Sequence, residues 1–63
     1  MVPAAHDIAL MARRLVRSHG FRRARRIAGA EARRAGGGPV RAMWLEVRDA
    51  VERLGALTSA VPG

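Results

Sequence analysis

Glycines divide this chain of 63 residues into three segments: Gly20 ends the first, and the triple glycine at 36–38 separates the second from the third. Glycine is enriched just past helix ends, because it adopts backbone conformations that other residues avoid. The first segment has apolar side chains at the i, i+3, i+4, i+7 spacing of one helix face: Ile8, Met11, Ala12 and Leu15. Pro3 suits the first position of this helix, and Asp7 is the alternative N-cap for a later start.

The second segment, residues 21–35, also repeats with a helical period. Its packing face is mostly alanine and consists of Phe21, Ala24, Ile27, Ala28, Glu31, Ala32 and Ala35. Such a face lets two helices approach closely but buries little apolar surface. Glu31, the only acid in this segment, is expected to pair with an arginine of a neighbouring helix.

The third segment shows the clearest helical pattern. Pro39 stands at a natural first position. A single apolar stripe follows, made by Val40, Met43, Trp44, Val47, Val51 and Leu54. Opposite charges four residues apart predict two pairs on the outer face, Arg48 with Glu52 and Asp49 with Arg53. Gly55 and the residues 58–63 are expected to end the helix.

These patterns predict an all-α fold: a small three-helix, antiparallel arrangement with short loops. We expect one domain over residues 1–57 and a short C-terminal tail over 58–63. A chain this small buries only about 60% of the surface that it exposes when unfolded. It also has no cysteine for a disulfide or a thiolate metal site. A partner would add buried surface, so a homo-oligomer is kept as an alternative to a monomer.

Little in the sequence favours catalysis or membrane insertion. His6 and His19 are the only histidines, and neither has a nucleophile or carboxylate at the spacing of a triad or metal site. The pair His6 and Asp7 indicates a helix start, and His19 is expected to cap the end of the first helix. We therefore expect a protein that is not an enzyme and uses no cofactor or metal. No stretch approaches the ~20 apolar residues of a membrane span, so a cytoplasmic location is the expectation.

Positive charge is concentrated in the first two segments. Residues 1–41 hold ten arginines against two acids, whereas residues 42–63 hold two arginines against three acids. All twelve basic residues are arginine, which, with thirteen alanines and seven glycines, is most simply explained by high-GC codon usage. The uneven distribution is therefore stronger evidence for an anionic partner than the identity of the side chain, because a merely solvated face normally mixes both signs.

The arginines of the second segment lie mainly on the side opposite its alanine face. Arg22 and Arg23 fall in the first helical turn, where the helix dipole disfavours cations by a few tenths of a kcal/mol. An anion held there by free N–H groups and guanidinium groups would offset this cost. We predict an anion-binding or partner-binding surface formed by Arg22, Arg23, Arg25, Arg26, Arg33, Arg13 and Arg17. An ordinary solvated face is the alternative.

The order of a helix, Gly20 and a basic helix matches the helix-turn-helix motif of DNA-binding proteins in part. The motif would need packed apolar side chains at positions 26 and 29, where this chain has Arg26 and Gly29. The second segment also has no Asn, Gln, Ser or Thr to read base edges. Nucleic acid is therefore expected to be bound mainly through its phosphates, with little sequence preference.

Three apolar side chains support a different partner. Leu10 and Leu45 fall away from the main stripes and are expected to be exposed, whereas Trp44 is expected to anchor the core. The alternative function is an accessory or regulatory subunit that docks on an acidic protein surface through the arginines plus Leu10, Leu45 or Trp44. A basic helix lying on anionic lipid is less favoured, because an alanine face binds a bilayer poorly.

The order of the motifs carries a family resemblance. A short apolar helix ending in "HG" is followed by an alanine-spaced helix with "AEAR", a glycine loop, and a last helix with "W" and then "V" and "L". This order resembles a family of short, uncharacterised bacterial three-helix proteins and covers most of the chain. The resemblance implies three helices and no known activity.

Overall fold

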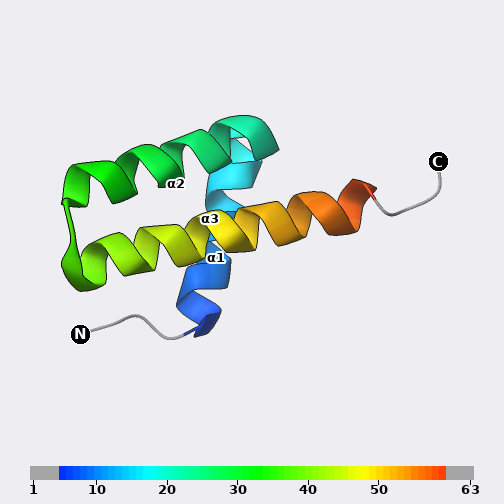
Figure 1. Cartoon of the computed structure of the whole chain (residues 1–63). Helices are drawn as coiled ribbons and strands as arrows, with labels where there is room; N and C mark the ends of the chain where they lie inside the picture. Colours follow the sequence, from blue (N-terminus) through cyan, green and yellow to red (C-terminus); the bar gives the residue numbers. More distant parts are fainter. Residues whose placement is uncertain (1–4, 60–63) are drawn as a thin grey trace.

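The computed structural model describes residues 5–59, which form three α-helices and no strand (Figure 1). The helices are α1 (Ala5–His19), α2 (Phe21–Ala35) and α3 (Gly38–Ser59). The predicted all-α class and the three helices are confirmed. Pro3 lies outside the described residues, and Asp7 lies within the first turn of α1 instead of capping a later start.

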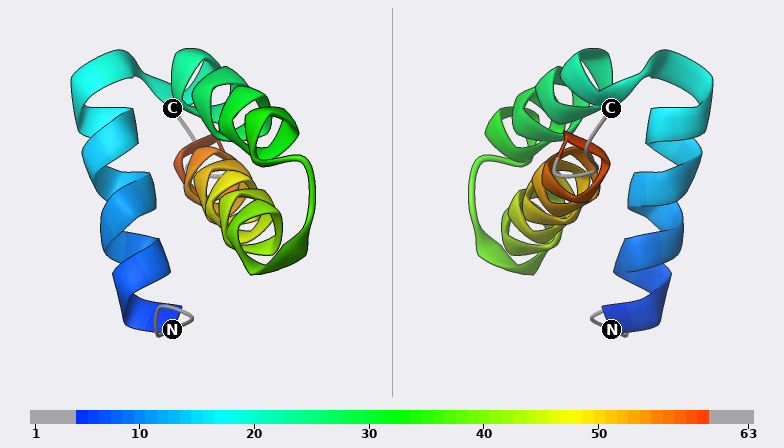
Figure 2. Two further views of the ribbon diagram at one scale, coloured as in Figure 1. Left: turned by 90° about the vertical axis from the view of Figure 1, so that its left-hand side faces the viewer. Right: turned by 90° about the vertical axis from the view of Figure 1, so that its right-hand side faces the viewer.

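Helices α2 and α3 run antiparallel side by side, and α1 crosses both of them steeply (Figures 1 and 2). The expectation that all three helices pack antiparallel is therefore wrong for α1. Its link to α2 is the single residue Gly20, which has φ 82° and ψ 167°. A one-residue link is shorter than the 2–8 residues that usually join neighbouring helices of a bundle. The chain changes direction at Gly20 without room to fold back alongside α1.

The core lies where the three helices meet. It consists of buried Ile8 and Ala12 from α1, Ala24 and Ala28 from α2, and Val47 and Val51 from α3. Partly buried side chains surround it, among them Met11, Leu15, Val16, Trp44, Ala50 and Leu54. The predicted alanine face of α2 is thus its buried face, and α2 makes its most extensive contact with α3.

The packing stripe and the end of the third helix differ from the expectation. Val40, placed on the packing stripe, is 56% exposed, because the first turn of α3 lies at the glycine loop, away from the place where α1 crosses (Figure 1). The helix also continues through Gly55 and includes Thr58 and Ser59, whereas residues 60–63 lie outside the described part. A glycine within a helix costs only about 0.5–1 kcal/mol relative to alanine, so it does not by itself end the helix.

Candidate functional site

The start of α2 is open to an anion. Gly20 is the N-cap and provides no side-chain hydrogen bond, and the first turn contains no acid. The Gly20 N–H donates to the Val16 carbonyl over 2.8 Å and the Ala24 N–H to the Gly20 carbonyl over 2.9 Å. The N–H groups of residues 21–23 are therefore the donors that every helix start leaves without an intrahelical acceptor. Arg22 and Arg23 lie in this first turn and are exposed, as the sequence predicted.

The basic and buried sides of α2 are separate, as expected. Ala24, Ala28 and Ala32 are 0–2% exposed. The arginines of this helix are all exposed: Arg22, Arg23, Arg25, Arg26, Arg33 and Arg34. The helix carries these six cations and one acid, whereas α3 carries three arginines and three acids. The positive charge of the molecule therefore belongs to α2 and, with three exposed arginines, to α1.

Ion pairs neutralise few of these arginines. Arg25 lies 3.8 Å from the Glu52 carboxylate of α3, and Arg34 lies 3.2 Å from Glu31. Glu31 therefore pairs within its own helix, and the expected pairing across helices is wrong. Seven arginines of α1 and α2 make no ion pair with any residue in the described range: Arg13, Arg14, Arg17, Arg22, Arg23, Arg26 and Arg33.

Arg48 of α3 lies beside Gly29 of α2, a contact that the sequence did not predict. Its Cδ atom would be 3.9 Å from a Cβ placed on Gly29, so its stem runs past the one position of α2 in this region that has no side chain. Its Nε atom is buried and has no hydrogen-bond partner among residues 5–59. Glu52, the acid expected to pair with Arg48, lies within ion-pair distance of Arg25 instead.

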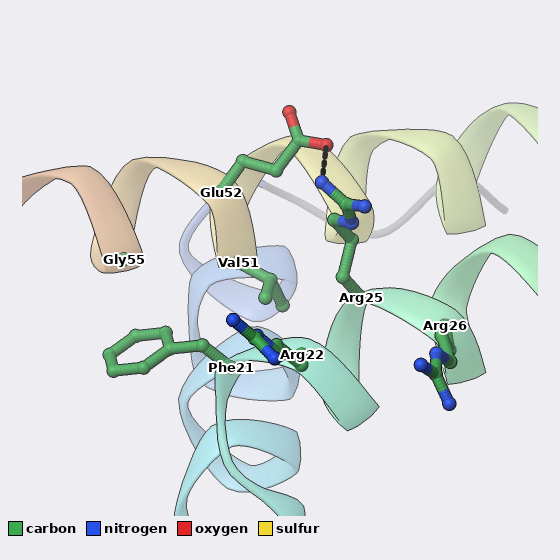
Figure 3. A pocket seen from close by; sticks show the side chains of 7 residues that line it. All are labelled: Phe21, Arg22, Arg25, Arg26, Val51, Glu52 and Gly55. Carbon is green, nitrogen blue, oxygen red and sulfur yellow. Dashed lines mark ion pairs between the residues drawn. The ribbon is translucent and has the colours of Figure 1, made fainter.

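An open groove between α2 and α3 brings some of the predicted residues together (Figure 3). Its volume is ≈ 640 Å³, and its lining consists of Phe21, Arg22, Arg25, Arg26, Val51, Glu52 and Gly55. The Phe21 ring extends beneath Gly55, Arg25 reaches toward Glu52, and Arg26 points away from that acid (Figure 3). The groove thus combines an aromatic ring, a neutralised ion pair and two arginines without an ion pair in the described chain.

The remaining predicted arginines lie outside this groove. Arg13 and Arg17 are exposed on α1, and Arg23 and Arg33 are exposed on α2, but none of the four lines the groove. Conversely, Phe21, Glu52 and Gly55 were not predicted as site residues. The helical period predicts Phe21 on the packing face, yet it is 37% exposed. Phe21 differs from the buried residues of the same face because it lies at the end of the part that α3 covers. The sequence does not show where this covered part ends.

The three apolar side chains of the alternative docking surface have different environments. Leu10 is 47% exposed, as expected. Leu45 is half-buried, so the expectation that it would be exposed is wrong. Trp44 is also half-buried and packs against the core at its edge instead of lying fully inside it.

The groups suited to catalysis or metal binding are few in this structure. The His6 Nε2 atom lies 3.2 Å from Asp7 Oδ1, and both side chains are largely exposed at the start of α1. Over residues 5–59, no three histidine or acidic side chains gather as metal ligands would. Over the same range, no helix has the length and apolar character that crossing a bilayer requires.

Comparison with known proteins provides no match: no family model, curated protein or solved structure aligns with this chain. The resemblance to bacterial three-helix proteins stays a prediction.

Proposed function

We propose that this protein is a small, non-enzymatic binding module that engages nucleic acid through phosphate contacts. The observation that carries this proposal is the set of seven exposed arginines on α1 and α2 without an ion pair among residues 5–59. A surface that only has to remain hydrated normally mixes charges of both signs. An unbalanced basic surface repels itself when free and gains affinity from a polyanion by releasing condensed counterions.

The composition of α2 favours contacts to phosphates over contacts to base edges. The helix contains no Asn, Gln, Ser or Thr, and its exposed arginines suit bidentate contacts to phosphate oxygens. Its link to α1 is one residue long, whereas a helix-turn-helix motif uses a turn of 3–4 residues. We therefore propose binding with little sequence preference, instead of reading of the major groove by a recognition helix.

A salt titration tests this function. The affinity for nucleic acids of unrelated sequence is measured by fluorescence anisotropy over a series of salt concentrations. Four phosphate contacts to duplex DNA predict a slope of about −3.6 for the logarithm of affinity against the logarithm of salt, and single strands predict about −2.8. Affinities that are similar across sequences support phosphate binding. An absence of binding to any nucleic acid at low salt would contradict the proposal.

A second candidate function is an accessory or regulatory subunit that docks on an acidic protein surface, and one observation favours it. Leu10 is exposed on α1, and Arg13, Arg14 and Arg17 follow it at the spacing of one helix face. A basic face with an apolar residue fits a protein surface better than a phosphate backbone. Leu10→Ser distinguishes the two functions: it weakens protein docking and leaves the affinity for nucleic acid unchanged.

A further inference from the structure

The groove between α2 and α3 contains an exposed aromatic ring beside arginines. Phe21 is 37% exposed, and it lines the groove together with Arg22 and Arg26, which have no ion pair over residues 5–59. We infer that the ligand of this groove is single-stranded nucleic acid, with an unpaired base stacked on Phe21 and the adjacent phosphates held by Arg22 and Arg26. This inference rests on the proposed function and specifies its ligand class.

The chemistry of the ring distinguishes single strands from duplexes. Proteins that bind single strands combine a basic groove with aromatic side chains, because every unpaired base offers a π-face that tolerates any sequence. In a duplex the bases are stacked on one another, and the phosphates alone remain for this groove. An exposed phenylalanine would add nothing to phosphate binding, so its place at the end of the groove beside Arg22 favours a ligand that has accessible bases (Figure 3).

The packing of Phe21 holds the ring in the groove wall. A Cβ atom on Gly55 would lie 3.4 Å from Cδ1, 3.7 Å from Cγ and 3.9 Å from Cε1 of the ring, so α3 supports the ring along one edge. A ring that is already supported loses less conformational entropy when a base stacks on it. The groove volume of ≈ 640 Å³ lies within the ≈ 300–1,000 Å³ of ordinary ligand sites.

The Glu52 carboxylate sets the side on which the phosphates lie. It is 3.8 Å from Arg25, so this arginine is neutralised within the groove and the acid repels phosphates near it. Arg26 points away from Glu52 (Figure 3). The phosphates are therefore placed at Arg22 and Arg26, whereas the base occupies the part of the groove next to Phe21 and Val51.

Two oligomers that differ only in their bases test the inference. Anisotropy is measured at low salt with oligothymidylate and with an abasic oligomer of the same length and charge. We expect the oligothymidylate to bind about 5- to 150-fold more tightly than the abasic oligomer, the range that stacking of one base typically provides. Equal binding of both would overturn the inference and leave phosphate binding intact. Binding of neither would contradict the proposed function as well.

A variant of Phe21 tests whether its ring causes the difference in affinity between the two oligomers. Phe21→Leu keeps an apolar contact with Gly55 but removes the π-face, so it should lose most of the preference for oligothymidylate and keep the affinity for the abasic oligomer. Leu10→Ala, which changes an exposed apolar side chain outside the groove, is the matched control and should keep both affinities. A Phe21→Leu protein that retains the full preference would overturn the inference.

A spectroscopic measurement on the unmodified protein does not depend on how the variant folds. Phe21 is the only phenylalanine in the chain, so its ring protons can be followed individually by NMR. Stacking of a base shifts these signals upfield, and the abasic oligomer should leave them nearly unchanged. Ring signals that respond equally to both oligomers would overturn the inference.

Discussion

The ring of Phe21 in α2 lies directly against Gly55 in α3. A Cβ atom placed on Gly55 would be 3.4 Å from the ring, which is an ordinary van der Waals distance. Both residues line the groove, so the same contact packs α2 against α3 and forms part of the wall of the candidate site. The glycine that was expected to end the third helix instead lies within it and faces the ring.

We expect Gly55→Ala to stabilise the protein. Gly55 has ordinary helical geometry, so alanine should gain about 0.5–1 kcal/mol in helix propensity and add a contact with Phe21. Urea unfolding, monitored by circular dichroism, measures the change in unfolding free energy. Gly29→Ala is a matched control within α2, where the new Cβ would be 3.9 Å from Arg48 Cδ. A destabilised Gly55→Ala variant would show that the ring cannot accommodate even one methyl group.

The same substitution should have the opposite effect at Gly20. Its φ of 82° and ψ of 167° belong to a region that is essentially restricted to glycine. We expect Gly20→Ala to cost about 1–3 kcal/mol of unfolding free energy, because the strain falls on the only residue that links α1 to α2. Apart from the two chain neighbours of Gly20, no residue in 5–59 has an atom within 4 Å of a Cβ at this position, so a clash with this part of the chain cannot explain the loss. A neutral result would mean that the link between the helices adopts another conformation.

Two valines on the predicted stripe of α3 should differ in their contribution to stability. Val47 is 0% exposed in the core, and its truncation to alanine should cost about 2–3 kcal/mol from lost burial and the cavity left behind. Val40 is 56% exposed, and Val40→Ala should change stability by no more than about 0.5 kcal/mol. Thermal unfolding of both variants makes the comparison. Similar losses would indicate that Val40 is covered in solution, as in a homo-oligomer.

Charge reversal at the start of α2 should separate binding from stability. Replacing Arg22 and Arg23 with glutamate places acids in the first turn, which should stabilise the helix by about 0.3–1 kcal/mol per residue at low salt. The same change sets carboxylates against the phosphates, so binding to nucleic acid should be lost.

The control for this double substitution changes the net charge by the same amount on α3. Arg41 and Arg53 are exposed on α3 and do not line the groove with Phe21, so replacing both with glutamate should weaken binding only modestly. Anisotropy and thermal unfolding are measured for both double variants. Equal losses of affinity would show that overall charge matters and the start of α2 does not.

Removal of the Glu52 charge should strengthen binding. Glu52→Gln releases Arg25 from its ion pair and removes the acid from the groove, so one more phosphate contact becomes available. The salt dependence should steepen by about 0.7 for a single strand. Stability should change by less than about 1 kcal/mol, since the pair is exposed to solvent. An unchanged affinity and slope would show that Glu52 does not limit phosphate binding in the groove.

Much of the fold could be predicted from local sequence. The glycines at 20 and 36–38 mark the ends of helices because few other residues adopt positive φ, and Gly20, Gly36 and Gly38 have φ between 76° and 82°. The alanine face of α2 is buried because its period matches that of the helix. The separation of arginines from this face follows from the same period. These features depend only on residues that are close together in the sequence.

Only the tertiary structure decided the direction of α1, the environment of Val40 and Leu45, and the composition of the groove. The groove joins Phe21 and Arg22 to Glu52 and Gly55, which lie about thirty residues away in the chain. Pairing of Glu52 with Arg25 instead of Arg48 depends on how α2 and α3 are positioned side by side. Helical period determines which side chains share a face, whereas contacts between faces depend on crossing angles and on where each helix is covered.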